Sequence, residues 1–120
     1  MIFFAGRPYA EGYMPNVNIV VGPVLMSTLD EEFEANMRGL KPNVENYQQF
    51  EQIKTVVGGR EAIIIDHEYN FPDESLWRML QMSVVEDDLA WNIACGAFPE
   101  IFSDNQEIIN QVVRSFRILK

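Results

Sequence analysis

The run Asp66-His67-Glu68 holds the residue types best suited to chemistry, because carboxylates and an imidazole can ligate metal ions or move protons. His67 is the only histidine among the 120 residues. The run lies in a segment, 62–71, whose isoleucine and aromatic residues predict a β-strand. Neighbouring side chains of a strand point to opposite faces, so His67 should point away from both carboxylates. We therefore expect His67 to pack among its neighbours with one hydrogen bond, and we expect no metal site.

Asp66 and Glu68 should share one face of that strand, where they could act as an acid–base pair in a small-molecule-binding or hydrolytic domain. Glycosidase-like chemistry needs two carboxyl groups across a cleft, which the sequence does not show. The alternative is a solvated face on which Arg78, from the next expected strand, relieves the repulsion between the two carboxylates. We favour this alternative.

Other patterns with catalytic potential are weak. Cys95, the only cysteine, lies in an apolar run and is typical of an inert core thiol. The pair Gly58-Gly59 lies between two strand-like runs and predicts a hairpin, since no helix with a Gly-Lys-Ser/Thr pattern follows to form a phosphate loop. No serine, cysteine or lysine occurs in a recognisable nucleophile motif. We therefore expect a protein without enzymatic activity and without a cofactor.

Composition and charge exclude several classes of protein. Apolar residues make up 48% of the chain, too many for a disordered protein, and the length predicts one domain spanning 1–120. The formal net charge of −9 disfavours nucleic acid and anionic membrane surfaces as partners, because both are negative. No apolar stretch approaches the ~20 residues of a membrane span, and no secretory signal is visible. The chain as given is expected to be cytoplasmic, or periplasmic or lumenal if a leader has been removed.

Most of the sequence predicts β-strands joined by tight turns. Two strands are expected at 1–6 and 16–23, and a four-stranded antiparallel meander at 50–98. Several of these strands carry apolar residues on both faces, which is typical of a sheet that is covered on both sides. The turns of the meander are expected at 58–59, 71–74 and 86–88.

Two helices are expected beside this sheet. Thr28 and Glu31 form a capping box before a stripe of apolar residues, and Pro42 ends this first helix. Ser103 and Gln106 form a second capping box, which predicts a helix that begins at Ser103. The resulting order, β-β-α-β-β-β-β-α, predicts an α+β fold in which helices pack against a mostly antiparallel sheet.

Large apolar side chains gather in the meander. Trp77, Met79 and Met82 lie on one expected strand, and Trp91 lies on the next. Methionine and aromatic side chains suit adaptable contacts with a partner protein. Most such residues in small domains belong to the core, and we favour that interpretation; any that are exposed would mark a binding face.

Several stretches of the sequence resemble the PsbP/Mog-like fold. In the first half they are residues 14–21 and 29–33, and in the second half residues 56–62 and the helix end at 114–116. Together they span nearly the whole chain. Within that superfamily the sequence is most similar to the DcrB group, which includes the Eag-type chaperones of bacterial type VI secretion.

The resemblance implies an α/β/α sandwich around an antiparallel sheet, without enzymatic activity. Family members usually carry one more strand before the position of Met1, and this chain is expected to lack that strand. The sheet edge that it would cover is then free to pair with another chain, which favours a homodimer.

Eag-type members shield hydrophobic N-terminal segments of secreted effectors with the concave face of the sheet. In this chain the resemblance places that face on 62–71, 76–85 and 89–97, and the candidate partner-binding residues are Trp77, Met79, Gln81 and Trp91. We therefore expect a chaperone or adaptor that shields a hydrophobic segment of a secreted or membrane-inserting client. The second hypothesis is a PsbP-like structural accessory subunit or lipoprotein domain.

Overall fold

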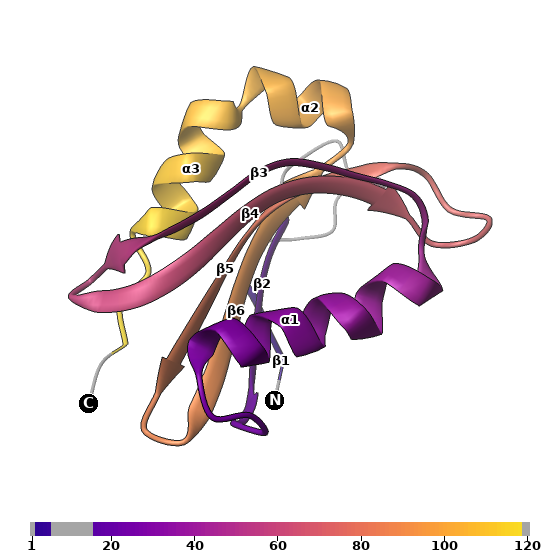
Figure 1. The fold of residues 1–120 in the computed structure, drawn as a ribbon. Coiled ribbons are helices and arrows are strands. Elements are labelled where there is room, and N and C mark those ends of the chain that lie inside the picture. Colours follow the sequence, from indigo (N-terminus) through magenta and orange to yellow (C-terminus); the bar gives the residue numbers. More distant parts are fainter. Residues whose placement is uncertain (1, 6–15, 119–120) are drawn as a thin grey trace.

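The computed structural model describes residues 2–5 and 16–118 of the chain. Of the strand predicted at 1–6, Met1 and Gly6 therefore lie outside the described residues. In chain order the elements are β1 (Ile2–Ala5), β2 (Asn16–Pro23), α1 (Leu29–Leu40), the short 3-10 helix η2 (Lys41–Asn43), β3 (Glu45–Val57), β4 (Arg60–Asn70), β5 (Trp77–Glu86), β6 (Leu89–Ala97), α2 (Pro99–Asp104) and α3 (Gln106–Arg114) (Figure 1).

The described strands form one antiparallel sheet in the order β1-β2-β6-β5-β4-β3. The predicted meander is confirmed as β3 to β6, although β3 begins at Glu45 rather than at residue 50. Its first turn contains Gly58 and Gly59, whose φ angles of 61° and 81° fit a tight hairpin that glycine adopts at low cost. Of the two strands that precede α1, β2 pairs with β6, at the far side of the meander from β3, and β1 pairs with β2.

Helices cover both faces of the sheet, with α1 on one face and α2 and α3 on the other (Figure 1). The predicted α+β fold class and the three-layer α/β/α arrangement are therefore confirmed. None of the helices among the described residues is long and apolar enough to cross a membrane.

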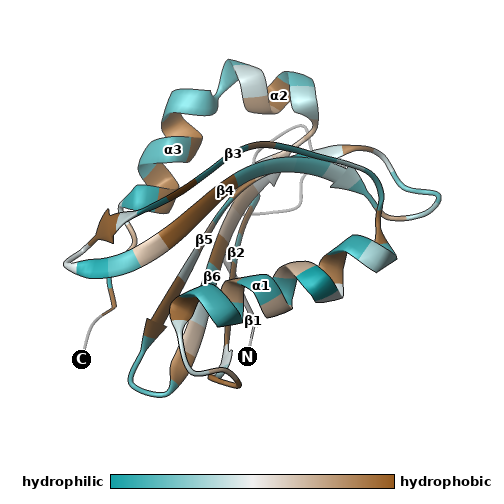
Figure 2. Cartoon of the chain, in the orientation of Figure 1, coloured by the Kyte–Doolittle hydropathy of each residue, from teal (hydrophilic) through white to brown (hydrophobic). Residues whose placement is uncertain are grey.

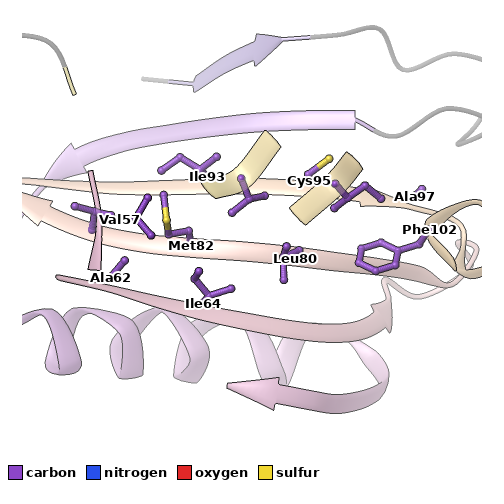
Figure 3. Close-up of a cluster of buried hydrophobic side chains, with 12 residues drawn as sticks. Val57, Ala62, Ile64, Leu80, Met82, Ile93, Cys95, Ala97 and Phe102 are labelled. Atoms are coloured by element: carbon purple, nitrogen blue, oxygen red, sulfur yellow. The ribbon is translucent and has the colours of Figure 1, made fainter. Parts of the chain in front are cut away.

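The larger hydrophobic core lies between the sheet and the helices α2 and α3. Phe102 of α2, and Ile109 and Val113 of α3, pack against every second residue of β4, β5 and β6. Each fully buried side chain of this size contributes about 2 kcal/mol to folding through removal of apolar surface from water. The sheet residues of this cluster include those labelled in Figure 3: Val57, Ala62, Ile64, Leu80, Met82, Ile93, Cys95 and Ala97.

A smaller core lies under α1, where Phe33 and Met37 pack on Ile63 and Ile65 of β4. Even-numbered residues of β4 therefore face one core and odd-numbered residues face the other. This explains the hydrophobic middle of β4 that is visible in Figure 2, because no residue there faces water.

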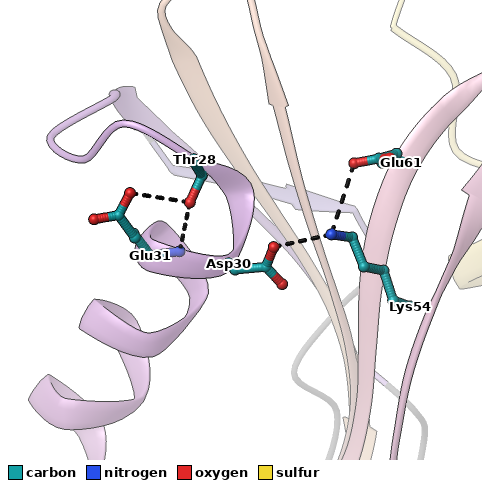
Figure 4. A network of polar contacts seen from close by, with 5 residues as sticks. All are labelled: Thr28, Asp30, Glu31, Lys54 and Glu61. Carbon is teal, nitrogen blue, oxygen red and sulfur yellow. Dashed lines mark hydrogen bonds and ion pairs between the residues drawn. The ribbon is translucent and has the colours of Figure 1, made fainter.

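The start of α1 is fixed by the predicted cap. The Oγ1 atom of Thr28 accepts a hydrogen bond from the backbone N–H of Glu31 at 3.1 Å, and it lies 3.1 Å from the Glu31 carboxylate (Figure 4). The cap is confirmed, although the Glu31 carboxylate bonds the Thr28 hydroxyl rather than a backbone N–H. The same helix end is tied to the sheet by Lys54, whose Nζ lies 2.9 Å from Asp30 and 3.8 Å from Glu61.

The prediction that the last helix begins at Ser103 is wrong. Helix α2 already begins at Pro99, whose fixed φ suits the first helical position, and Ser103 lies exposed within it. The helical path breaks at Asn105, which has φ −120° and ψ 17° and whose side chain donates a 2.8 Å hydrogen bond to the carbonyl of Ile101. Residues 116–118 form neither a helix nor a strand, and Leu119 lies outside the described residues.

Candidate functional site: a groove on the α1 side of the sheet

On its α1 side the sheet is only partly covered, because α1 packs on β4 and β5 and hardly contacts β2 and β6. A groove of about 310 Å³ lies at the strand ends nearest the β4–β5 connection. We call it the α1-side groove. It is lined by Asn16, Asn18, Tyr69, Asn70, Phe71, Glu74, Trp77, Met79 and Gly96.

Trp77 and Met79 share one face of β5, as strand alternation predicted, and both line the α1-side groove. Each side chain is half-buried. The Trp77 ring packs against Phe98, with ring centroids 5.2 Å apart. The Sδ atom of Met79 accepts a hydrogen bond from the hydroxyl of Tyr69 at 3.0 Å, and burial raises the pKa of Tyr69. Both predicted residues are thus held in place while part of their surface stays open.

Gln81 lies on the same face of β5 but just outside the groove lining. Its Nε2 donates to Oδ1 of Asn92 at 3.3 Å, and the hydroxyl of Ser83 donates to the same oxygen at 2.7 Å. On β2, the Oδ1 atom of Asn18 is buried and has no hydrogen-bond partner among residues 16–118. The apolar groove is therefore flanked by a strip of polar side chains, which we call the polar strip: Asn18, Gln81, Ser83 and Asn92.

Trp91 lies on the other face of the sheet, so the structure does not bring it together with the other three predicted residues. It pairs with Val84 of β5 and Val21 of β2, and its ring packs 5.6 Å from that of Phe116, beside the larger core. The reason is the register of the β5–β6 hairpin, which pairs Glu86 with Leu89. With this register, odd residues of β6 share a face with even residues of β5.

Asp66 and His67 point to opposite faces, as predicted, so the run 66–68 does not form a catalytic cluster. The guanidinium of Arg78 donates two hydrogen bonds to the Asp66 carboxylate, at 3.0 and 2.8 Å, which confirms the predicted pairing. His67 is fully buried, and its Nδ1 atom lies 3.0 Å from the hydroxyl of Tyr47. The packed, hydrogen-bonded histidine is thus also confirmed.

Burial favours the neutral forms of two side chains, His67 and Cys95. Burial lowers the pKa of His67 to about 4, against smaller opposite effects of Gln81 and Asp66. Burial also raises the pKa of the Cys95 thiol to about 11, so the predicted core thiol is confirmed and stays protonated at neutral pH. Within the described residues, no three His, Cys, Asp or Glu side chains are grouped so that they could hold a metal ion.

No family model matches the chain, and no curated protein matches it in sequence. Solved structures do match its fold. PA94 from Pseudomonas aeruginosa, described as a protein of unknown function and a candidate regulator, superposes with a TM-score of 0.80 at 7% identity, over 100% of this chain and 83% of that one. Cyanobacterial PsbP (CyanoP) from Synechocystis sp. PCC 6803 gives a TM-score of 0.65 at 7% identity, over 98% and 82%.

A third similar structure is LpqN of Mycobacterium tuberculosis, which is involved in cell envelope biogenesis. It gives a TM-score of 0.63 at 14% identity, over 85% of this chain and 61% of that one. At such identities the likeness concerns the fold alone. The chain has the PsbP-like fold that its sequence resembles, whereas membership of the DcrB group stays a prediction.

Proposed function

We propose that this protein is a non-enzymatic chaperone or adaptor of the DcrB/Eag kind, which shields a hydrophobic segment of a secreted or membrane-inserting client in the α1-side groove. One observation carries this proposal: Trp77 and Met79 lie half-buried, with part of their surface open, in a concave surface that α1 does not cover. Apolar surface gathered in a groove is removed from water when a partner covers it. Tryptophan supplies a large contact area, and the flexible thioether of methionine adapts to clients of different shape.

The size of the α1-side groove indicates how a client would be held. At about 310 Å³ it is at the small end of ligand pockets, so it takes a few side chains rather than a whole helix. The client segment would anchor these side chains between Trp77, Met79 and Tyr69. The rest of the segment would then lie along β5 and β6, beside the polar strip.

The polar strip supports a client helix that is built for a membrane. Such helices often carry Ser, Thr or other polar groups that normally bond a neighbouring helix within the bilayer. The side-chain amides of Asn92 and Gln81 offer donors and acceptors for those groups. A groove with only apolar side chains would leave the polar groups of the client helix without hydrogen-bond partners, at a cost of about 1–3 kcal/mol each.

A PsbP-like accessory subunit is the second candidate, and the fold shared with CyanoP supports it. It would use the same groove to hold a permanent partner, whereas a chaperone releases its client. Exchange of a labelled client by an unlabelled one separates the two: release within minutes supports the chaperone, and no release supports the subunit. The expected homodimer is tested separately by the sedimentation velocity of the purified chain.

The proposal is tested with a fluorescently labelled, apolar helical peptide that carries one serine. We expect saturable binding, measured by fluorescence anisotropy, and at least tenfold weaker binding to a Met79→Glu variant, because a carboxylate in the groove would be desolvated. A Trp77→Ala variant should weaken binding by a similar factor, since it removes the largest apolar contact.

The matched control is Ile108→Glu, which introduces the same charge at an exposed position of α3 on the opposite face. This variant should bind the peptide as the unchanged protein does. Equal weakening by Ile108→Glu and Met79→Glu, with both variants folded by circular dichroism, would place the binding site elsewhere and refute the proposal. A secreted-effector gene beside the gene of this protein would support the assignment to type VI secretion.

A further inference from the structure

A second groove lies on the opposite face of the sheet, between α3 and the edge strand β3. Its volume is about 410 Å³. Because α2 and α3 lie mainly over β5 and β6, they leave part of the α3-side surface of β3 and β4 uncovered. We call this space the α3-side groove. Its floor is apolar and consists of Ile53, Ile64, Leu80 and Phe102.

The helix wall of this groove is polar along its whole length. Gln106, Asn110 and Arg114 follow one another at intervals of four residues, so they share one flank of α3. Asn110 Oδ1 accepts a 3.0 Å hydrogen bond from Nε of Arg114, which leaves the Asn110 amide hydrogens and the outer nitrogens of the guanidinium available. Gln106 makes no side-chain hydrogen bond within the described part of the chain. The wall therefore presents both donors and acceptors to the groove.

Opposite charges stand unpaired at the two ends of this wall. Neither Arg114 nor Glu107 makes an ion pair with any described residue, and the same holds for Glu51 on the opposite wall of the groove. By contrast, the charges of Asp66 and Arg78 beside the floor neutralise each other. Glu107 and Arg114 are seven residues apart on the helix, which separates their Cα atoms by about 10 Å along its axis.

This spacing selects the length of a ligand that carries both charges. The ammonium and carboxylate of a single amino acid are too close together to reach both ends of the wall. An extended peptide of three residues spans about 10 Å, at roughly 3.5 Å per residue. Its amide groups would face Gln106 and Asn110, and its apolar side chains would face the floor of the groove.

We propose that the α3-side groove binds free peptides of about three residues with apolar side chains, with the ammonium group at Glu107 and Glu51 and the carboxylate at Arg114. The dipole of α3 opposes this orientation, since it favours cations at the carboxyl end of the helix. The dipole carries only about half a charge at each end, along the axis, whereas the peptide lies on the flank beside the full charges of Glu107, Glu51 and Arg114. The site lies on the other face from the α1-side groove and does not depend on the function proposed there.

The test uses the ¹⁵N-labelled full chain and the peptide Leu-Ala-Leu, followed by NMR titration. We expect saturable shifts of the side-chain amide signals of Gln106 and Asn110. An amidated carboxyl end should weaken binding about three- to fivefold, in the upper part of the range expected of an exposed ion pair, and so should an acetylated amino end. In an Arg114→Gln variant, amidation of the peptide should not weaken binding further, because the partner of the peptide carboxylate has been removed.

The control variant is Arg38→Gln, which removes an exposed arginine of α1 on the opposite side of the sheet. It should leave binding and the effect of amidation unchanged. Absence of saturable shifts at Gln106 and Asn110, or binding of the amidated peptide as tight as that of the free one, overturns the proposal. The proposal is also overturned if amidation weakens binding to the Arg114→Gln variant by the same factor as it weakens binding to the unchanged protein.

Discussion

Gly96 on β6 lies directly across from Met79 on β5, and the methionine side chain occupies the space that a β-carbon on Gly96 would need. Such a β-carbon would lie 2.8 Å from Cγ of Met79 and 3.1 Å from the carbonyl oxygen of Arg78. The missing side chain therefore lets Met79 lie across β6 in the α1-side groove. The geometry of the groove depends on this one glycine.

A Gly96→Ala substitution should push Met79 out of its position. We expect a loss of about 1–3 kcal/mol in the free energy of unfolding, which is typical of an overpacked site, together with weaker binding of apolar peptides. Urea denaturation measures the first effect and fluorescence anisotropy the second. The control is Gly22→Ala on β2, on the same face of the sheet, where an added β-carbon would meet no described atom within 4 Å apart from its chain neighbours, so this variant should be close to neutral. Equal effects of the two substitutions would show that crowding at Met79 is not the cause.

The ion pair of Asp66 and Arg78 joins β4 and β5 beside the floor of the α3-side groove. The guanidinium of Arg78 also lies over two rings, 4.2 Å from the centroid of Phe50 and 4.8 Å from that of Phe102. Asp66→Ala would leave a largely buried arginine without its partner, so we expect a loss of about 2 kcal/mol, below the 3–5 kcal/mol of fully buried pairs. Thermal or urea denaturation checks this value.

Glu34→Ala serves as the comparison for that ion pair, because Glu34 and Arg38 pair on α1 with side chains that are 69% and 67% exposed. Its effect should stay within about 0.5 kcal/mol. A loss for Asp66→Ala that is no larger than this would mean that stacking on the two rings holds Arg78 without help from the carboxylate.

The elements of the fold could be predicted from local signals. Strand alternation, the Gly58-Gly59 turn and the cap at Thr28 each act within a few residues of chain, and each is present. The break at Asn105 was missed because the pattern at Ser103 imitates a cap, whereas Pro99 already fixes the helix start four residues earlier. The pairing of β2 with β6 is a long-range contact, and no local pattern encodes it.

The candidate site could be predicted only in part for the same reason. Alternation within β5 places Trp77, Met79 and Gln81 together without any knowledge of the neighbouring strands. The face of Trp91 depends instead on the hairpin register, which the two-residue turn fixes by pairing Glu86 with Leu89. No sequence pattern indicated a role for Gly96, since that role arises from its close approach to Met79 on another strand.

The two tryptophans should therefore respond differently to substitution. Trp91→Ala removes a ring that packs beside the larger core, so we expect a loss of about 2–3 kcal/mol in stability and little change in peptide binding. Trp77→Ala should show the reverse pattern, because its ring borders the open groove. Urea denaturation and anisotropy titrations give the two values for each variant. If both variants lose stability equally and bind the peptide equally, the division of roles between the two faces is wrong.

Stability should fall in mild acid because His67 is buried in its neutral form. Its pKa is lowered to about 4 in the folded protein, chiefly by burial, whereas the imidazole of an unfolded chain titrates near 6.5. Between these values the unfolded state binds more protons, so the free energy of unfolding rises with pH and is lost as the pH falls from 6.5 towards 4. The full loss from this residue is on the order of 3 kcal/mol.

Carboxylates titrate at the lower end of this range, so the comparison is made between pH 6.5 and 5 with a His67→Gln variant. Glutamine cannot titrate there and can still bond the hydroxyl of Tyr47, which lies 3.0 Å from Nδ1 of His67. Urea denaturation at each pH should show a steeper decline for the unchanged protein, approaching about 1.4 kcal/mol per pH unit. Parallel declines in both proteins would mean that His67 accepts a proton without disturbing the packing of Tyr47 and Tyr69 around it.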